Sequence, residues 1–232
     1  TLYPPPDIWI NPEFFEVELP AGEIATESLI IGNSGGGMLE FQLGVLGNYS
    51  MTEVPYQWLD GVTDGISLNL GDDDYAVIDL PFNFTFYGEE FNTIYVSSNG
   101  YVDFVYPYPT DFSEEPIPST SPEHQKLIAV LWDDWNPAAG GDVYVKTFTN
   151  PNRFVITWYN VPHYPDTTPA STFQLVIYES GEIMFSYHTV GYVDGVTVGL
   201  NDGDGIHFSS YGLVPSPGTS ILFVPIQFLT LS

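Results

Sequence analysis

The sequence predicts an all-β protein, a jelly-roll-like antiparallel β-sandwich preceded by a small immunoglobulin-like segment. Two observations favour this fold. Short runs of β-branched and aromatic residues recur along the chain, separated by Gly, Pro, Asn and Asp. No stretch of about ten residues free of Gly and Pro shows the i, i+3, i+4, i+7 apolar spacing of an amphipathic helix. The 22 glycines and 20 prolines supply the turns that many short strands need.

Residues 1–47 predict three strands that follow a lead at 8–12, which ends in a proline. The strands are expected over 14–19, 28–31 and 39–45. A Pro-Ala-Gly-Glu turn separates the first two, and an Asn-Ser-Gly-Gly-Gly turn precedes the third. This order of strands and turns resembles the first half of immunoglobulin-like modules of the BACON type, which occur on bacterial and archaeal surface proteins. The resemblance implies a partial immunoglobulin-like module.

Three strands leave an apolar face and a sheet edge open, so the N-terminal module needs a further strand. The C-terminal segment 225–232 looks like residues 12–19, because each is a proline followed by an apolar strand that contains phenylalanine. This segment could pair with the N-terminal module in cis, or enter a neighbouring subunit as a donor strand. The apolar residues of the expected assembly strand are Ile226, Phe228, Leu229 and Leu231.

A linker is expected over 48–65 and the main β-sandwich domain over 66–224. The clearest expected strands of this domain are 95–98, 142–148, 154–159, 173–178, 183–187, 197–200 and 220–224. Residues 179–182 form a tight hairpin between two of them, in which Gly181 can supply the positive φ of such a turn.

Several motifs of the main domain occur in a fixed order. They are VSSNGY from Val96, WDD from Trp132, FVITWYNV from Phe154, FQLVIYESGEI from Phe173 and VTVGLNDGDG from Val196. This pattern resembles β-sandwich modules of large secreted and cell-surface proteins of archaea and bacteria. The resemblance implies a fold and a place outside the cell, and it implies no reaction.

Composition excludes several classes of function. The formal net charge is −27, with 3 Lys and Arg against 30 Asp and Glu, which excludes nucleic-acid binding by phosphate neutralisation and docking to anionic lipids. The absence of cysteine excludes disulfides and thiolate metal sites. No apolar run approaches the roughly 18 residues of a membrane span, so membrane insertion is not expected.

An extracellular or cell-surface location is expected from this acidic, Cys-free composition. The chain begins at Thr1 rather than Met, which fits either a removed signal peptide or a chain cut at this position. Sequons at Asn48 and Asn83 are expected glycosylation sites of an exported chain.

Clusters of acidic residues in Gly-containing loops suggest calcium as the only cofactor, because calcium prefers several carboxylate and carbonyl oxygens. The candidate metal ligands are Asp72, Asp73, Asp74, Asn201, Asp202 and Asp204. The alternative is that Asp and Gly form turns without an ion. For Asp133 and Asp134 we expect hydrogen bonds to loop amides at the end of the strand that contains Trp132.

No catalytic set is recognisable, so the protein is not expected to be an enzyme. The four histidines lack i, i+4 metal-binding pairs, and there is no Gly-x-Ser-x-Gly motif. The acidic pairs 89–90 and 114–115 are adjacent in sequence, and neighbouring residues of a strand point to opposite faces.

Tyrosine-rich loops are the candidate binding sites. Tyr106, Tyr108, Tyr159 and Tyr164 lie among prolines with few charges. Such rings can stack on sugars or form protein interfaces, and alternatively they cover the ends of the sandwich.

Two functions therefore compete. In the first, the chain is a non-catalytic extracellular structural subunit of a surface layer or filament, a homo-oligomer or polymer joined by β-strand complementation, with calcium or salt between the acidic faces. In the alternative, it is a glycan- or protein-binding β-sandwich module of a larger secreted or cell-surface protein.

Overall fold

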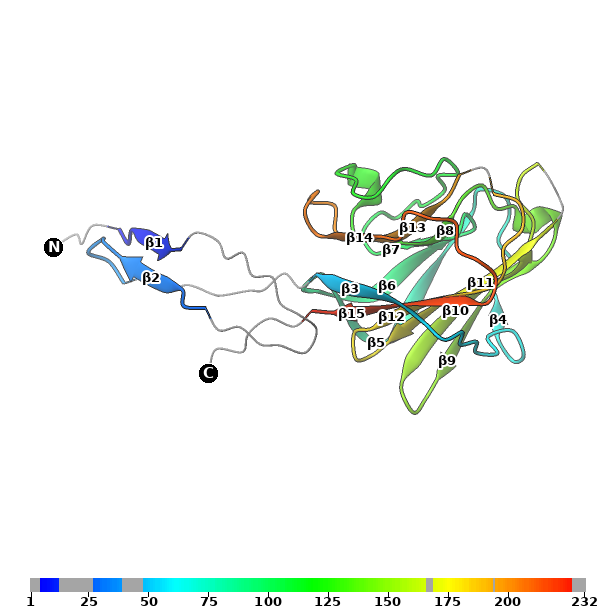
Figure 1. Ribbon diagram of the computed structural model, residues 1–232, viewed down its shortest axis with the longest axis horizontal. Coiled ribbons are helices and arrows are strands. Elements are labelled where there is room, and N and C mark those ends of the chain that lie inside the picture. The colour runs from blue at the N-terminus through cyan, green and yellow to red at the C-terminus, as the bar shows by residue number, and fades with distance from the viewer. Residues whose placement is uncertain (1–4, 13–26, 39–47, 166–168, 194, 227–232) are drawn as a thin grey trace. The chain divides into compact units, whose positions relative to one another are not determined.

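The computed structural model describes residues 5–12, 27–38, 48–165, 169–193 and 195–226 (Figure 1). The chain divides into two units, Thr1–Gly44 and Val45–Ser232. Nearly all regular structure in the described residues is β-strand, which confirms the all-β prediction. No helix in the part of the chain that is described has the length and apolar character needed to cross a membrane.

The N-terminal unit contains an antiparallel pair of strands, β1 (Ile8–Asn11) and β2 (Ile30–Asn33). The side chain of Asn33 organises the turn that follows, because its Oδ1 accepts the N–H groups of Asp7 (3.0 Å) and Gly35 (2.9 Å). Its Nδ2 donates to the carbonyl of Gly37 at 2.7 Å. The second strand begins two residues later than the expected 28–31, and the lead is itself a strand. The expected strands 14–19 and 39–45 lie outside the described residues.

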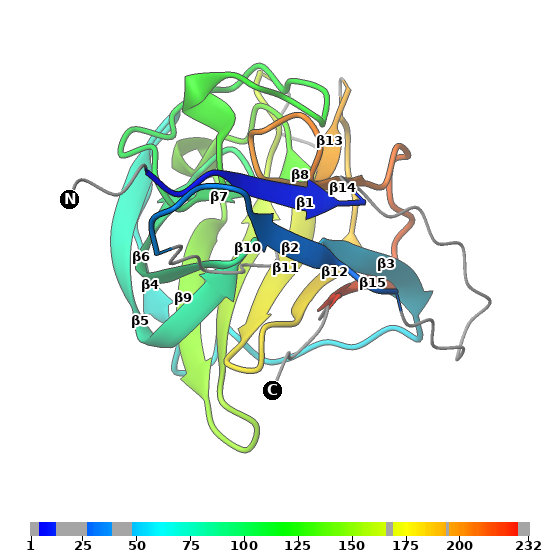
Figure 2. The same cartoon turned by 90° about the vertical axis from the view of Figure 1, so that its left-hand side faces the viewer.

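The second unit consists of two antiparallel sheets (Figures 1 and 2). The first has seven strands in the order β3 (Tyr49–Val54), β15 (Thr219–Pro225), β12 (Ile183–Thr189), β11 (Ser171–Tyr178), β10 (Arg153–Val161), β9 (Asp142–Phe148) and β4 (Ile66–Ser67). The second has six in the order β14 (Phe208–Ser210), β13 (Thr197–Asn201), β8 (Leu127–Trp132), β7 (Tyr101–Asp103), β6 (Glu89–Ser97) and β5 (Tyr75–Phe86). Two short 3-10 helices, η1 (Pro122–His124) and η2 (Pro137–Ala139), lie in the connections.

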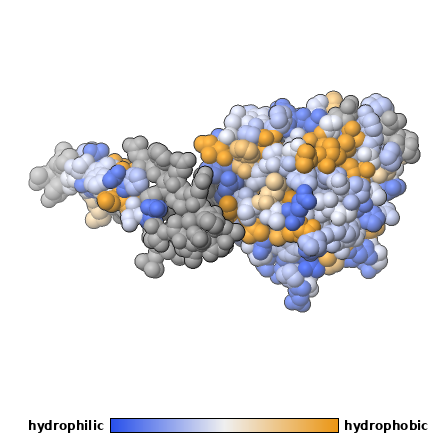
Figure 3. Space-filling model, viewed as in Figure 1, coloured by the Kyte–Doolittle hydropathy of each residue, from blue (hydrophilic) through white to orange (hydrophobic). Residues whose placement is uncertain are grey.

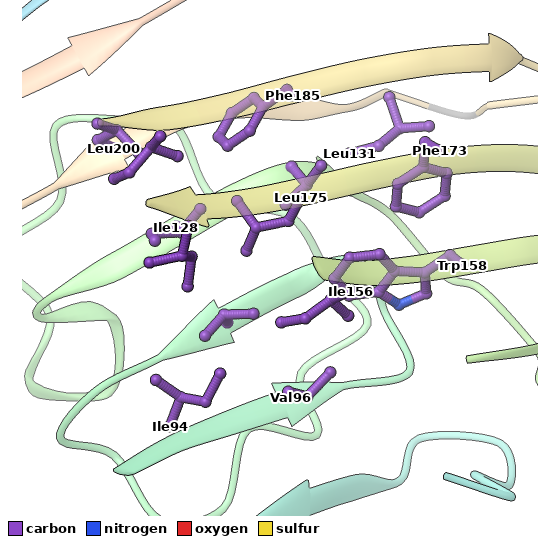
Figure 4. Packing of buried hydrophobic residues seen from close by; sticks show 14 of the residues in the cluster. Ile94, Val96, Ile128, Leu131, Ile156, Trp158, Phe173, Leu175, Phe185 and Leu200 are labelled. Atoms are coloured by element: carbon purple, nitrogen blue, oxygen red, sulfur yellow. The ribbon is translucent and has the colours of Figure 1, made fainter. Parts of the chain in front are cut away.

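The core lies between the inner faces of these sheets (Figure 4). Ile94 and Ile128 of the six-stranded sheet pack in one buried cluster with Leu175 and Phe185 of the seven-stranded sheet. Hydrogen bonds also join the sheets. Among them, the Trp158 indole N–H donates to the Ser97 carbonyl at 3.0 Å, and the Tyr187 hydroxyl donates to the Val130 carbonyl at 2.7 Å. The buried polar groups of Trp158 and Tyr187 are thus paired across the core.

Residues 48–65, expected to be a linker, belong to the sandwich. Strand β3 pairs with β15 from Tyr49 opposite Pro225 to Val54 opposite Ser220. Leu59 then packs against the outer face of the seven-stranded sheet and exchanges two hydrogen bonds with the Gln174 side chain, at 2.9 and 3.2 Å. The linker prediction is corrected on this point: β3 is an exposed edge strand, so its composition lacks the apolar signal of a buried strand.

The hairpin at 179–182 is confirmed. Gly181 has φ +106°, and its N–H donates to the Tyr178 carbonyl at 2.9 Å between β11 and β12. Hydrophobic residues also gather in patches on the visible surface of this unit (Figure 3). Among the described residues of this unit, the large hydrophobic side chains with at least 60% exposure are Ile66, Tyr108, Ile206 and Leu213.

Candidate binding site

A pocket of about 280 Å³ lies where the loop after β7 meets η1. Its lining combines aromatic rings with ionisable groups: Tyr101, Tyr106, Tyr108, Thr110, Asp111, Phe112, Glu123 and His124. Tyr101 comes from β7 and His124 from η1, while most of the others come from the loop between these elements. The pocket therefore depends on how that loop is held.

Asp103, the last residue of β7, fixes the start of the loop. Its Oδ1 accepts the N–H groups of Val105 at 2.7 Å and Tyr106 at 2.5 Å. The side chain is fully buried, and its Oδ2 has no hydrogen-bond partner among the described residues. Burial raises the pKa of this carboxyl to about 7, against the lowering effect of the two amides.

Asp111 is held through its main chain. Its N–H donates to the Tyr101 hydroxyl at 3.0 Å, and its carbonyl accepts from the Trp132 indole at 3.1 Å and the Asn99 amide at 3.3 Å. Asn99 and Trp132 belong to two of the five motifs that the sequence analysis recognised, VSSNGY and WDD. These motifs thus position one wall of the pocket.

His124 is buried beneath the pocket between two carboxylates. Its Nδ1 lies 3.1 Å from Glu115 Oε2, and its ring packs edge-on against Trp132 with 4.8 Å between centroids. Its Nε2 lies 3.4 Å from Asp111 Oδ2, but the two atoms are not aligned for a hydrogen bond, and Nε2 has no other partner among the described residues. The pocket wall therefore contains a buried ring nitrogen whose hydrogen-bonding capacity is not satisfied within the described residues.

Tyr106 and Tyr108 stand nearly perpendicular to each other, with centroids 6.4 Å apart. Tyr108 is 61% exposed and also packs edge-on against Tyr75. Phe112 is 49% exposed. The pocket therefore offers aromatic surface to solvent in a fixed arrangement.

The structure brings together two of the four predicted tyrosines. Tyr159 extends from β10 and packs edge-on against Tyr144, and Tyr164 donates its N–H to the Asp134 carbonyl at 2.9 Å. Both are exposed, and neither lines the pocket. The sequence analysis did not identify His124, Asp111 or Glu123, because their meeting depends on the fold of a long Pro- and Ser-containing loop.

The first predicted acidic cluster is partly assembled. Ligand atoms of Asp72, Asp73 and Asp134 lie within 4.8 Å of one another, and these residues could hold a cation. Burial, then the charges of Asp73 and Asp72, raise the pKa of Asp134 to about 6. Asp74 instead shapes the turn, because its carboxylate accepts the N–H groups of Gly71 (3.0 Å) and Tyr75 (2.9 Å). Calcium at this cluster stays a prediction.

In the second predicted acidic cluster, Asn201 and Asp202 form hydrogen bonds or ion pairs with other residues of the chain. The Asn201 amide donates to the carbonyls of Ser119 (2.9 Å) and His124 (2.6 Å), and Asp202 is paired with Lys126. The atoms that converge within 4.8 Å are those of Asp202, Asp204 and His207. Slight burial raises the pKa of Asp204, but hydrogen bonds from His207 and from the Ile206 N–H outweigh this and lower it to about 2.

Asp133 accepts the N–H of Asp134 at 2.9 Å and faces His163 Nε2 at the same distance, so it fixes the chain after Trp132 as expected. At the sequons, Asn48 Oδ1 accepts the N–H of Tyr49, and the exposed Asn83 donates to Glu90 at 2.6 Å. Glycosylation of either stays a prediction.

In the expected assembly strand, Ile226 donates its N–H to the Asn48 carbonyl at 2.7 Å. Phe228, Leu229 and Leu231 lie outside the described residues.

Comparison with known proteins identifies a family. A family profile described as NIDO related matches residues 48–222. The chain is similar to alpha-tectorin of Mus musculus and of Homo sapiens, each 26% identical over 156 residues, and to that of Gallus gallus, 24% identical over the same length. Each alignment covers 55% of this chain and 7% of the relative, so the chain spans a small part of these relatives. No solved structure matches the chain significantly.

The comparisons therefore replace the resemblance drawn from the motifs. They support a secreted type of module, and they do not support the BACON type or the archaeal and bacterial modules. The profile match begins at residue 48 and leaves residues 1–47 outside.

Proposed function

The chain belongs to the NIDO-related family, and we propose that it is a non-catalytic extracellular recognition module of a larger protein, which binds a protein or glycan partner through the tyrosine-lined pocket. The similarity to a region of alpha-tectorin, an extracellular protein, supports the location. The small share of each relative that is covered supports a module within a longer chain.

These findings favour a module over a self-assembling filament subunit. In the second unit, β3 pairs with the side of β15 that faces away from β12. Strand β15, which precedes the expected assembly strand, therefore has partners on both sides within the same chain. The pocket provides the main argument for binding, because exposed aromatic rings contribute large contact area at small entropic cost.

The pocket is also preorganised. Tyr106 is held through Asp103, and Asp111 through Tyr101, Trp132 and Asn99. A site whose loops are already ordered avoids part of the entropic cost of binding. His124 lies between carboxylates at both ring nitrogens, which supports a role in positioning and ligand contact.

Binding of the whole chain to arrays of glycans and of extracellular proteins tests this proposal. We expect one or more partners to be bound, and Tyr108→Ala to weaken that binding at least tenfold, since central aromatic residues often contribute more than about 1.4 kcal/mol to an interface. Tyr159→Ala is the matched control, because Tyr159 is 46% exposed but lies outside the pocket. Equal loss in both variants, or none in Tyr108→Ala, would overturn the proposed site.

A further inference from the structure

The charge of the pocket indicates what kind of group it accepts. Asp111 and Glu123 line it, and Glu115 lies behind His124. The three Lys and Arg side chains of the chain lie elsewhere: Lys126 pairs with Glu89 and Asp202, Lys146 donates to the carbonyls of Asp60 and Thr63, and Arg153 lies over the Phe148 ring. The carboxylates that face the pocket are thus not neutralised by lysine or arginine.

The aromatic lining favours the same kind of ligand. The faces of the Tyr101, Tyr106, Tyr108 and Phe112 rings carry negative electrostatic potential, which attracts ammonium and guanidinium groups. An anionic sugar would meet carboxylates instead. A neutral sugar would gain stacking but no Coulomb attraction.

His124 provides an acceptor. When Nδ1 carries the proton and donates to Glu115, Nε2 presents a lone pair, and Asp111 Oδ2 lies 3.4 Å from it without an aligned hydrogen bond. Two neighbouring acceptors can both be satisfied by one group that carries several N–H donors. Alkylammonium and guanidinium groups are such donors.

We propose that the pocket binds an organic cation, an alkylammonium or guanidinium group, with its apolar stem against Tyr106 and Tyr108 and its N–H groups on Asp111 and His124. This inference rests on the proposed function and specifies its ligand. The volume of about 280 Å³ is at the small end for ligand sites and suits the end of a side chain or a small amine. The net charge of −27 also attracts basic partners over a distance.

The test uses the whole chain and probes that differ only in charge. Amide chemical shifts are followed by NMR during titration with N-acetyl-arginine methylamide and with its neutral isostere N-acetyl-citrulline methylamide. N-acetyl-lysine methylamide is compared with the norleucine compound in the same way. We expect saturable shifts at Tyr106, Tyr108 and His124 with the cations, and at least tenfold weaker binding of the neutral compounds. Equal binding of the neutral compounds would overturn the proposal.

Variants separate a built site from general charge attraction. Asp111→Asn is expected to weaken cation binding about tenfold, whereas Glu179→Gln, which removes an equal charge from an exposed hairpin, should leave it within about twofold. Equal effects would overturn the proposal in favour of non-specific attraction. Because the wild-type probe series needs no variant, misfolding of Asp111→Asn would not remove the test.

Two further arms separate this inference from the proposed function and identify the source of the cation. If methyl glycosides shift the same residues and the cations cause no shift, the proposal of a cation ligand is wrong, whereas the proposed function as a recognition module still stands. Loss of partner binding in Tyr108→Ala without any cation response would lead to the same conclusion. The affinity of the chain for Gly-Arg-Gly and Gly-Lys-Gly is compared with its affinity for tetramethylammonium. Tighter binding of the peptides indicates that the cation is a side chain of a partner protein, and tighter binding of the free ion indicates a small amine. Either result supports an organic cation.

Discussion

At the scale of single residues, Asp103 shows how a buried carboxylate can support a binding loop at a cost in stability. Its Oδ1 holds the Val105 and Tyr106 amides, but its Oδ2 is buried without a partner among the described residues. Its pKa of about 7 lies above the usual value of about 3.9, so the folded state binds the proton more tightly than the unfolded state. Ionisation therefore destabilises the fold, and this contribution grows as the pH rises from about 4 to about 7.

We expect Asp103→Asn to be more stable than the wild type at about pH 8, by on the order of 1 kcal/mol. The amide keeps the Oδ1 acceptor and cannot ionise, although its unpartnered Nδ2 offsets part of the gain. Urea unfolding at about pH 4 and about pH 8 measures the effect, and the pH dependence should be flatter in the variant. Asp103→Ala, which loses both loop hydrogen bonds, should be destabilised at both pH values. An Asn variant less stable than the wild type at the higher pH would contradict this account.

A local pattern in the sequence can place neighbouring side chains together, but it cannot place those that meet through the fold. Tyr106 and Tyr108 are two positions apart in a proline-rich loop, so their proximity could be read from the sequence, and both line the pocket. His124 and Asp111 are 13 positions apart by number and meet only because Trp132 and Asn99 bind the loop. Such contacts depend on tertiary structure, and no local spacing could have revealed them.

At the scale of elements, strands with strong apolar patterns were predicted closely, and weakly patterned ones were not. The expected strand 142–148 coincides with β9 (Asp142–Phe148), where buried and less buried residues alternate. Strand β3 is mostly exposed, and its polar sequence resembles a linker. Its position is set by pairing with β15, which lies far away in the sequence.

The reassignment of β3 predicts where the chain can be cut. A fragment of residues 45–232 should unfold cooperatively, because it contains both complete sheets. A fragment of residues 66–232 should be much less stable, since it loses β3, the buried Tyr49 ring and the contact of Leu59 with the outer face. Removing one large core side chain alone typically costs about 3–5 kcal/mol. Circular dichroism during urea unfolding compares the fragments, and equal midpoints would show that residues 45–65 do not belong to the folded unit.

At the scale of the whole molecule, the excess of negative charge opposes folding. The 30 acidic residues face only 3 Lys and Arg, and the ion pairs that Lys126 makes with Glu89 and Asp202 neutralise little of it. Repulsion is greater in the compact state than in the expanded unfolded chain, because the charges are closer together. Asp72, Asp73 and Asp134 are a local example, in which burial, and after it the charges of Asp73 and Asp72, raise the pKa of Asp134.

This repulsion predicts a marked response to salt. The screening length falls from about 30 Å at about 0.01 M salt to about 10 Å at about 0.1 M, so added NaCl should weaken repulsion between distant carboxylates far more than the short contact of Lys126 with Glu89. We therefore expect the urea midpoint to rise between these two NaCl concentrations at neutral pH. Sucrose at matched osmolality should give a smaller rise, because it does not screen charge. An unchanged urea midpoint would mean that the acidic groups of the folded state are too widely spaced for their repulsion to matter. Screening by NaCl would then also have little effect on the attraction of a basic partner.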